Sequence, residues 1–182
     1  GVRRIEAITA DKAAEFFAGQ TKLIEEVKEL VKNPVDPIRG VKNLLEENAK
    51  LRSRIDELNS VIVSDLASKL INEATDVNGI LLVAAKLALD PAVVKDLAYR
   101  ILSSGDKYLA VLVNQFDGKP GITVAISEPL VKLKGLNAGN LVKELAREIQ
   151  GGGGGQPHYA TAGGKDISGI DRVLDKTRIL FM

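Results

Sequence analysis

Two stretches of heptad-spaced residues, separated by a proline turn, most constrain the fold of this chain. The first stretch alternates intervals of four and three residues: Phe16, Gln20, Leu23, Val27 and Leu30. The second continues the same alternation: Val41, Leu44, Asn48, Leu51, Ile55, Leu58 and Ile62. Because the intervening segment 34–37 (PVDP) stops a helix and turns the chain, we expect residues 11–75 to form an antiparallel helical (coiled-coil) hairpin.

The two helices of this hairpin differ in length. At 1.5 Å per residue the first is about 33 Å long and the second about 54 Å. The apolar end of the longer helix, residues 61–70, therefore needs cover from the following domain or from another copy of the chain. Asn48 at a seam position either fixes register or oligomeric state or is simply solvated.

From residue 76 onward the pattern predicts a small α/β domain with a mixed sheet, so the fold class is α+β/α/β. Expected strands are 80–89, 108–115 and 122–126, the last two joined as a hairpin by the turn 117–121. Expected helices are 91–102, 137–150 and 168–176. Asp90 is the predicted cap of the first of these, and Ser168 with Asp171 forms a capping box for the last. The domains are then 1–10, 11–75 and 76–182, with residues 1–10 forming a strand end.

Composition excludes several classes of function. The chain has no cysteine, one histidine (His158) and a net charge of +1. Disulfides, thiol chemistry and most metal or acid-base sites are thereby excluded, and any polyanion must be bound by a local basic patch. The longest apolar run, 80–89, is interrupted by Lys86 and is too short for a membrane span. We expect a cytoplasmic, non-catalytic piece of a longer protein that binds no metal or membrane.

The segment 151–164, GGGGGQPHYATAGG, contains seven glycines in fourteen residues. It follows a helix rather than a strand, and Gly164-Lys165 is followed by Asp166, so it matches neither the dinucleotide fingerprint nor the P-loop. A backbone without side chains allows close approach of a phosphate-bearing ligand, and we predict a binding loop; a mobile surface loop is the alternative. The predicted nucleic-acid-binding residues are Lys132, Lys134, Lys143, Arg147, Gly151, Gly152, Gly153, Gly154, Gly155, Tyr159, Gly163, Gly164 and Lys165. Tyr159 either stacks on a base or closes the loop onto the core.

Two segments resemble the alanyl-tRNA synthetase family. Arg3-Arg4-Ile5-Glu6-Ala7 resembles the end of its editing domain. Leu136-Asn137-Ala138-Gly139, the run 151–155 and the stretch 160–166 are similar to the glycine motif of its C-terminal DHH-associated domain. With the helices between them, the resemblance spans nearly the whole chain. This sequence departs from the family at Gln156-Pro157-His158, where a basic residue, proline and aspartate are common.

The resemblance implies a tRNA-binding and oligomerisation fragment. The family attaches alanine to its tRNA with ATP and hydrolyses mischarged tRNA in a zinc-dependent editing domain, so ATP, Mg and Zn are expected only in the parent enzyme. Alanine-specific tRNA and a second copy of the chain are the implied partners. The alternatives are the tail of a free-standing alanyl-tRNA editing hydrolase, the substrate-binding domain of a DHH phosphoesterase, and a pure oligomerisation module.

Overall fold

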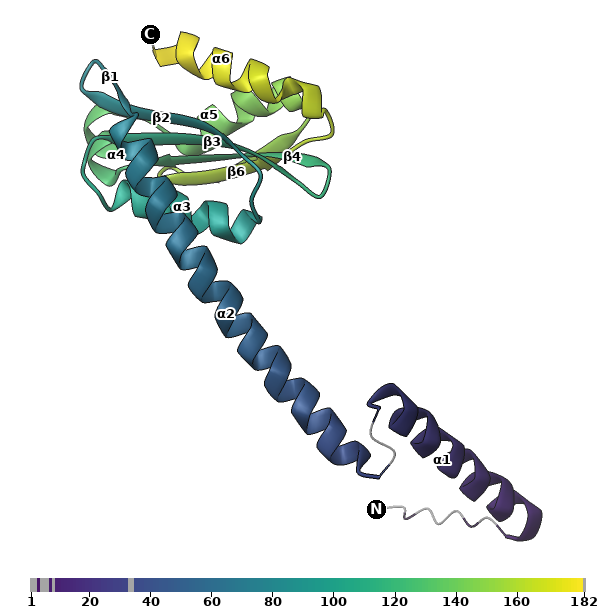
Figure 1. Ribbon diagram of the computed structural model, residues 1–182. Helices are drawn as coiled ribbons and strands as arrows, with labels where there is room; N and C mark the ends of the chain where they lie inside the picture. Colours follow the sequence, from purple (N-terminus) through teal and green to yellow (C-terminus); the bar gives the residue numbers. More distant parts are fainter. Residues whose placement is uncertain (1–2, 4–6, 8, 33–34, 182) are drawn as a thin grey trace. The chain divides into compact units, whose positions relative to one another are not determined.

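A computed structural model describes residues 3, 7, 9–32 and 35–181, which divide into two compact units, 1–57 and 58–182 (Figure 1). The predicted strand end at 1–10 depends on Val2, Ile5 and Ile8, which lie outside the described residues. Each unit has its own local structure, and the helix α2 (Pro37–Asn72) contributes residues to both.

The first unit consists of α1 (Ala10–Leu30) and the first part of α2. Pro37 suits the first turn of α2 because a proline there leaves no unpaired N–H, and Asp36 Oδ1 accepts the backbone N–H of Arg39 at 2.9 Å. Both predicted helices are confirmed. The coiled-coil hairpin is not: α1 has no buried residue, and Leu23 of α1 and Leu51 of α2 are 56% and 57% exposed.

The last turns of α2 belong to the second unit. Val63 and Ala67 lie one helical turn apart, are 9% and 2% exposed, and pack in a core with residues of the helix α3 (Pro91–Leu102). Leu66 and Leu70 pack against the same core. The end of this helix was expected to pack on the following domain or on another copy of the chain, and the structure shows that it packs on the following domain.

Six strands form one mixed sheet in the order β1-β2-β3-β4-β6-β5. Their bounds are β1 (Thr75–Val77), β2 (Ile80–Leu87), β3 (Tyr108–Phe116), β4 (Lys119–Ile126), β5 (Gly152–Gln156) and β6 (Tyr159–Gly163). Strands β2 and β3 are parallel because α3 crosses over between them, and the other neighbouring pairs are antiparallel. Asp117 and Gly118 have positive φ angles of 48° and 69°, as a two-residue hairpin turn between β3 and β4 requires. The predicted mixed sheet and hairpin are confirmed.

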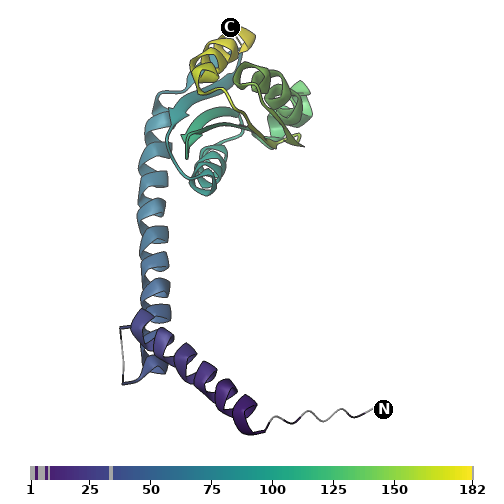
Figure 2. The same cartoon turned by 90° about the vertical axis from the view of Figure 1, so that its right-hand side faces the viewer.

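Helices cover both faces of the sheet (Figure 2). The helix α3 packs on one face; α4 (Glu128–Lys134), α5 (Ala138–Leu145), the 3-10 turn η1 (Ala146–Ile149) and α6 (Ile170–Phe181) contribute to the core on the other. Successive residues of β3 alternate between the two cores, with Val111 in one and Leu112 in the other, both fully buried. Asp90 caps α3 as predicted, accepting the N–H of Ala92 at 2.8 Å.

Three predictions about the second unit need correction. The glycine-rich segment is not a loop but the antiparallel hairpin β5–β6, because its glycines allow two backbones to lie very close together. The last helix runs to Phe181, and Asp166 rather than the predicted pair caps the 3-10 turn before it, η2 (Ile167–Gly169). The short elements β1 and α4 were not predicted, since three and seven residues are too few to show a clear hydrophobic period.

Candidate nucleic-acid interface

Three glycines lie next to one another on three adjacent strands and form a strip of sheet without side chains. Gly163 of β6 pairs with Gly121 of β4 on one side and with Gly152 of β5 on the other. A Cβ atom added at Gly152 or Gly163 would meet no heavy atom within 4 Å, and one at Gly121 would lie 3.6 Å from the carbonyl oxygen of Ala162. Packing therefore does not require glycine at these three positions, which we call the glycine row.

Other glycines of the same segment are required by packing. A Cβ atom added at Gly151, Gly153 or Gly155 would lie 2.1, 2.1 or 2.4 Å from a carbonyl oxygen of the neighbouring strand β6, and one at Gly164 would lie 2.3 Å from that of Ile149. These neighbours are backbone atoms, which cannot move without separating the strands. Glycines of two kinds therefore alternate along β5. Gly153 and Gly155 are required for the close packing of β5 on β6, whereas Gly152 leaves the surface without a side chain.

The glycine row lies in a groove made of two adjoining hollows of 740 and 340 Å³. The larger hollow lies between the first turns of α3 and the strands β4 and β6. The smaller one extends toward Lys165. The two share Lys119, Pro120, Gly152 and Gly163 in their walls, so they are continuous, and we call them together the glycine groove.

The charged side chains that line the glycine groove are all lysines. Lys95 comes from α3, Lys119 from the start of β4, and Lys165 follows β6. No aspartate or glutamate lines either hollow, and none of the three lysines has an ion-pair partner within the described part of the chain. The groove therefore offers unpaired positive charge beside bare backbone, an arrangement that favours an anionic ligand.

Tyr159 forms part of the wall of the larger hollow. It is half-buried and stacks on Tyr99 of α3, with ring centroids 5.3 Å apart and an angle of 11° between the planes. Burial raises the pKa of Tyr159 above its ordinary value of 10.0, so its hydroxyl stays neutral at physiological pH. Both alternatives for Tyr159 remain open, because the ring packs against the core and also lines the groove.

Comparison with known proteins places this fold in a family. The family model of the DHHA1 domain matches residues 77–180, which is more than half of the chain. The chain belongs to the DHHA1 domain family. The matched residues include all of the sheet except the start of β1, together with the whole glycine groove.

The curated relatives of this DHHA1 protein extend the similarity over the helices as well. Alanine-tRNA ligase of Christiangramia forsetii is 43% identical over 176 residues, which are 97% of this chain and 20% of the relative. That of Cytophaga hutchinsonii is 44% identical over 182 residues, 99% of this chain and 21% of the relative. The chain thus spans about a fifth of the length of the curated relatives it matches. The resemblance to the alanyl-tRNA synthetase family is confirmed.

A solved structure shares the fold. The C-Ala domain of Aquifex aeolicus alanyl-tRNA synthetase superimposes with a TM-score of 0.54 at 18% identity, over 59% of this chain and 96% of that domain. This similarity supports the small α/β architecture of the DHHA1 domain.

The structure brings together some of the predicted binding residues and separates others. Those lining the glycine groove are Tyr159, Gly151, Gly152, Gly163, Gly164 and Lys165. Those absent from its walls are Lys132, Lys134, Lys143, Arg147, Gly153, Gly154 and Gly155.

The lysines outside the groove have other neighbours. Lys132 pairs with Glu128 at 3.0 Å, and Lys134 donates a hydrogen bond to the carbonyl of Asn78. The Cε atom of Lys143 lies 3.9 Å from the place of a Cβ at Gly154 of β5.

Sequence reasoning missed Lys95 and Lys119. They come from α3 and β4, far from the glycine segment in the chain. The sheet order places Lys119 in the same hollow as Lys165, and the packing of α3 on the sheet places Lys95 in the adjoining hollow. The available signal for Lys119 was the Asp117-Gly118 pair, since a two-residue turn there puts Lys119 at the start of the returning strand.

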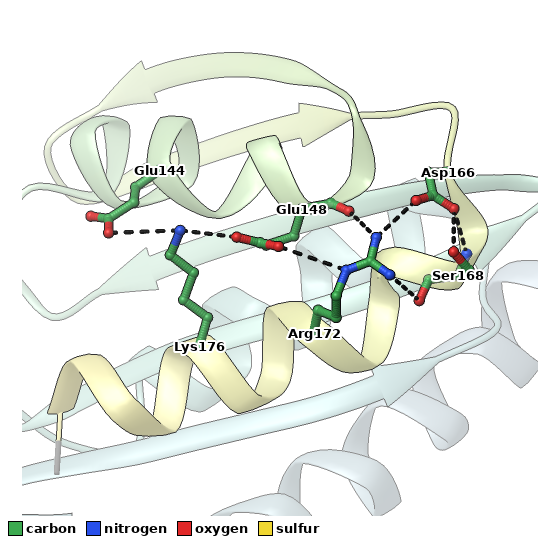
Figure 3. Close-up of polar contacts among 6 residues, drawn as sticks. All are labelled: Glu144, Glu148, Asp166, Ser168, Arg172 and Lys176. Carbon is green, nitrogen blue, oxygen red and sulfur yellow. Dashed lines mark hydrogen bonds and ion pairs between the residues drawn. The ribbon is translucent and has the colours of Figure 1, made fainter.

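A cluster of ion pairs fixes the chain just after Lys165 (Figure 3). Arg172 of α6 bonds Asp166 Oδ2 at 2.8 Å and the carbonyl of Glu148 at 3.0 Å, and Lys176 bonds Glu148 Oε1 at 3.0 Å. Hydrogen bonds from Ser168 and then from Arg172 hold the pKa of Asp166 below its ordinary value of 3.8. The backbone N–H groups of residues 165 and 166 both donate to the carbonyl of Ile149, at 2.9 and 3.0 Å. Lys165 therefore projects from a rigid stretch of backbone.

Neither a metal centre nor a membrane span is found in the residues that the structure describes. No group of three or more histidine, cysteine, aspartate or glutamate side chains there is arranged to hold a metal ion. No described helix has the length and apolar character needed to cross a bilayer.

Proposed function

We propose that this chain is the C-terminal tRNA-binding part of an alanine-tRNA ligase and that the glycine groove binds the sugar-phosphate backbone of the tRNA. The names of the relatives, which match nearly the whole chain, support this assignment. In this proposal the parent enzyme attaches alanine with ATP and Mg²⁺ and edits mischarged tRNA at a zinc site, both outside this chain. We propose that the protein acts in the cytoplasm.

The observation that carries the proposal is the glycine row between unpaired lysines. At positions 152 and 163 a side chain would fit, so packing of the hairpin does not require glycine there. The effect of Gly152 and Gly163 is to leave the surface of the sheet without side chains. A phosphate can approach such a backbone closely. Lys119 supplies charge where the two hollows meet, and Lys165 supplies it in the smaller hollow. Tyr159 at the wall of the larger hollow offers an aromatic surface to a base.

Filter binding with alanine-specific tRNA at several salt concentrations tests this proposal. The double variant Lys119→Ala/Lys165→Ala should weaken binding and reduce the log-log salt slope by about 0.7–0.9 for each lysine. Gly163→Val should weaken binding without unfolding, because its side chain enters open space in the groove.

The matched control is Lys132→Ala, which removes a lysine from the same domain but outside the groove and should leave binding unchanged. Equal affinity of the wild type and the double variant at every salt concentration, with intact circular dichroism, would refute the groove as the binding surface.

The proposal also includes the division of the chain and its self-association. Residues 1–10 end the editing domain, 11–75 form the connecting helices, and 76–182 form the tRNA-binding domain. The chain associates as a homodimer, which the exposed apolar residues of α1 and α2 support. Sedimentation velocity over a range of protein concentrations tests this part, and a monomer at all of them would refute it.

A further inference from the structure

The smaller hollow of the glycine groove has two walls that come from different segments of the chain. One wall is the segment 150–152, which directly follows η1, and the other is the segment 163–165, which ends with Lys165. The pairing of β5 with β6 joins the two walls at Gly152 and Gly163 and ends there. The rest of each wall is therefore held by contacts outside the sheet.

The wall that contains Lys165 packs on the last two residues of η1. The backbone N–H groups of Lys165 and Asp166 both donate to the carbonyl of Ile149. Three residues further on, a Cβ atom added at Gly169 would lie 2.0 Å from the carbonyl oxygen of Glu148, so the two backbones are in contact there as well. Because the other wall begins directly after Ile149, both walls are attached to the same two residues.

Arg172 of α6 bonds both sides of this contact. Its Nη2 donates to the carbonyl of Glu148 at 3.0 Å and to Asp166 Oδ2 at 2.8 Å, and its Nε lies 3.7 Å from Glu148 Oε2 (Figure 3). One planar guanidinium thus joins η1 to the segment after β6, a geometry that the compact ammonium of a lysine does not match. The side chains of Asp166 and Glu148 are only 20% and 28% exposed, which limits competition from water.

Arg172 itself lies outside the groove. It lines neither hollow, and two carboxylates already pair with its charge. Lys165 lines the smaller hollow and has no ion-pair partner within the described part of the chain. Lys165 can therefore meet an anion in the groove, whereas Arg172 acts on the position of Lys165.

We propose that Arg172 is a positioning residue for the glycine groove, because by bonding Glu148 and Asp166 it fixes both walls of the smaller hollow and the place of Lys165. This inference rests on the proposed binding of tRNA in the groove and names a residue of α6, outside the groove, that sets its affinity. Without Arg172 the segment after β6 is less ordered, and ordering it again on binding costs affinity.

A double-mutant cycle separates this role from a direct contact and from a general loss of stability. Filter binding measures the affinity of the full chain for alanine-specific tRNA in Arg172→Ala, Lys165→Ala and the double variant. Arg172→Ala should weaken binding about threefold to tenfold, and the double variant should bind like Lys165→Ala to within about twofold. The log-log salt slope should fall by about 0.7–0.9 in Lys165→Ala and no further in the double variant.

Two further variants of α6 are the controls, and circular dichroism verifies that every variant is folded. Arg172→Lys keeps the charge but not the guanidinium geometry, and it should weaken binding as much as Arg172→Ala does. Arg178→Ala removes an arginine that pairs with Asp175 at 3.6 Å, away from Arg172, and should leave binding unchanged. Equal weakening by Arg172→Ala with and without Lys165 would overturn the inference, because a direct phosphate contact or a general destabilisation gives additive effects.

Hydrogen exchange tests the same contacts without tRNA. In Arg172→Ala the amides of residues 165 and 166 should exchange about tenfold faster than in the wild type, with those of α3 unchanged. Unchanged protection at these two residues would overturn the positioning role. Full affinity of Arg172→Ala together with weak binding by Lys119→Ala/Lys165→Ala would overturn this inference alone, whereas full affinity of Lys119→Ala/Lys165→Ala would overturn the proposed function and the inference with it.

Discussion

Two glycine-to-alanine substitutions in neighbouring strands should have opposite effects on stability. A Cβ at position 153 would lie 2.1 Å from the carbonyl oxygen of Thr161 and 2.4 Å from Cα of Ala162, so β5 must move about 1 Å away from β6. Overpacking costs about 1–3 kcal/mol, and loss of two strand hydrogen bonds adds about 2 kcal/mol. Gly153→Ala should therefore lower the free energy of unfolding by about 3–5 kcal/mol.

Gly163→Ala should instead raise the free energy of unfolding by about 0.5 kcal/mol. Its Cβ enters open space, and alanine restricts the unfolded chain more than glycine does. Urea unfolding followed by circular dichroism measures both variants against the wild type. A Gly153→Ala variant within about 1 kcal/mol of the wild type would show that β5 is not held against β6 as described, and strong destabilisation by Gly163→Ala would show that the glycine row is structural.

Three further predictions address the parts that surround the groove. Asn114 is buried and bonds both backbone groups of Leu89, accepting from its N–H at 3.0 Å and donating to its carbonyl at 2.6 Å, so Asn114→Ala should cost about 2–3 kcal/mol in urea unfolding. Ala67→Leu should cost about 1–3 kcal/mol by overpacking the contact of α2 with the domain, and an unchanged midpoint would mean that the helix end is not docked. Since the pKa of Asp166 is lower folded than unfolded, its stabilisation is present above pH 3.8 and lost as the pH falls through the folded pKa; unfolding curves of the wild type and Asp166→Asn should differ at neutral pH and converge in acid.

Local patterns in the sequence predicted much of the second unit. The helix α3 was predicted with its actual bounds because Asp90 and Pro91 mark its start by local chemistry. The β3–β4 hairpin was predicted because segment 117–121 (DGKPG) is rich in turn-forming residues, and the structure shows positive φ angles at Asp117 and Gly118. The heptad spacing predicted two helices but not what packs on them, since a periodic apolar face can pack against another helix of the same chain, a neighbouring domain or a second copy of the chain.

The glycine segment shows where local pattern fails. Its composition indicated an open loop, yet five of its residues form an edge strand, because glycine has no intrinsic strand preference and β5 exists only where β6 can pair with it.

The sequence alone determined the elements whose signals lie within a few residues, the family relationship, and the exclusion of cysteine chemistry. Tertiary structure alone decided the site: strand order brings Lys119 of β4 beside Lys165, and register aligns Gly121, Gly152 and Gly163 in one row. The reason is physical, since contacts between residues far apart in the chain depend on which strands pair and in which register, and hydrogen bonds between the strands settle both only once the sheet has formed.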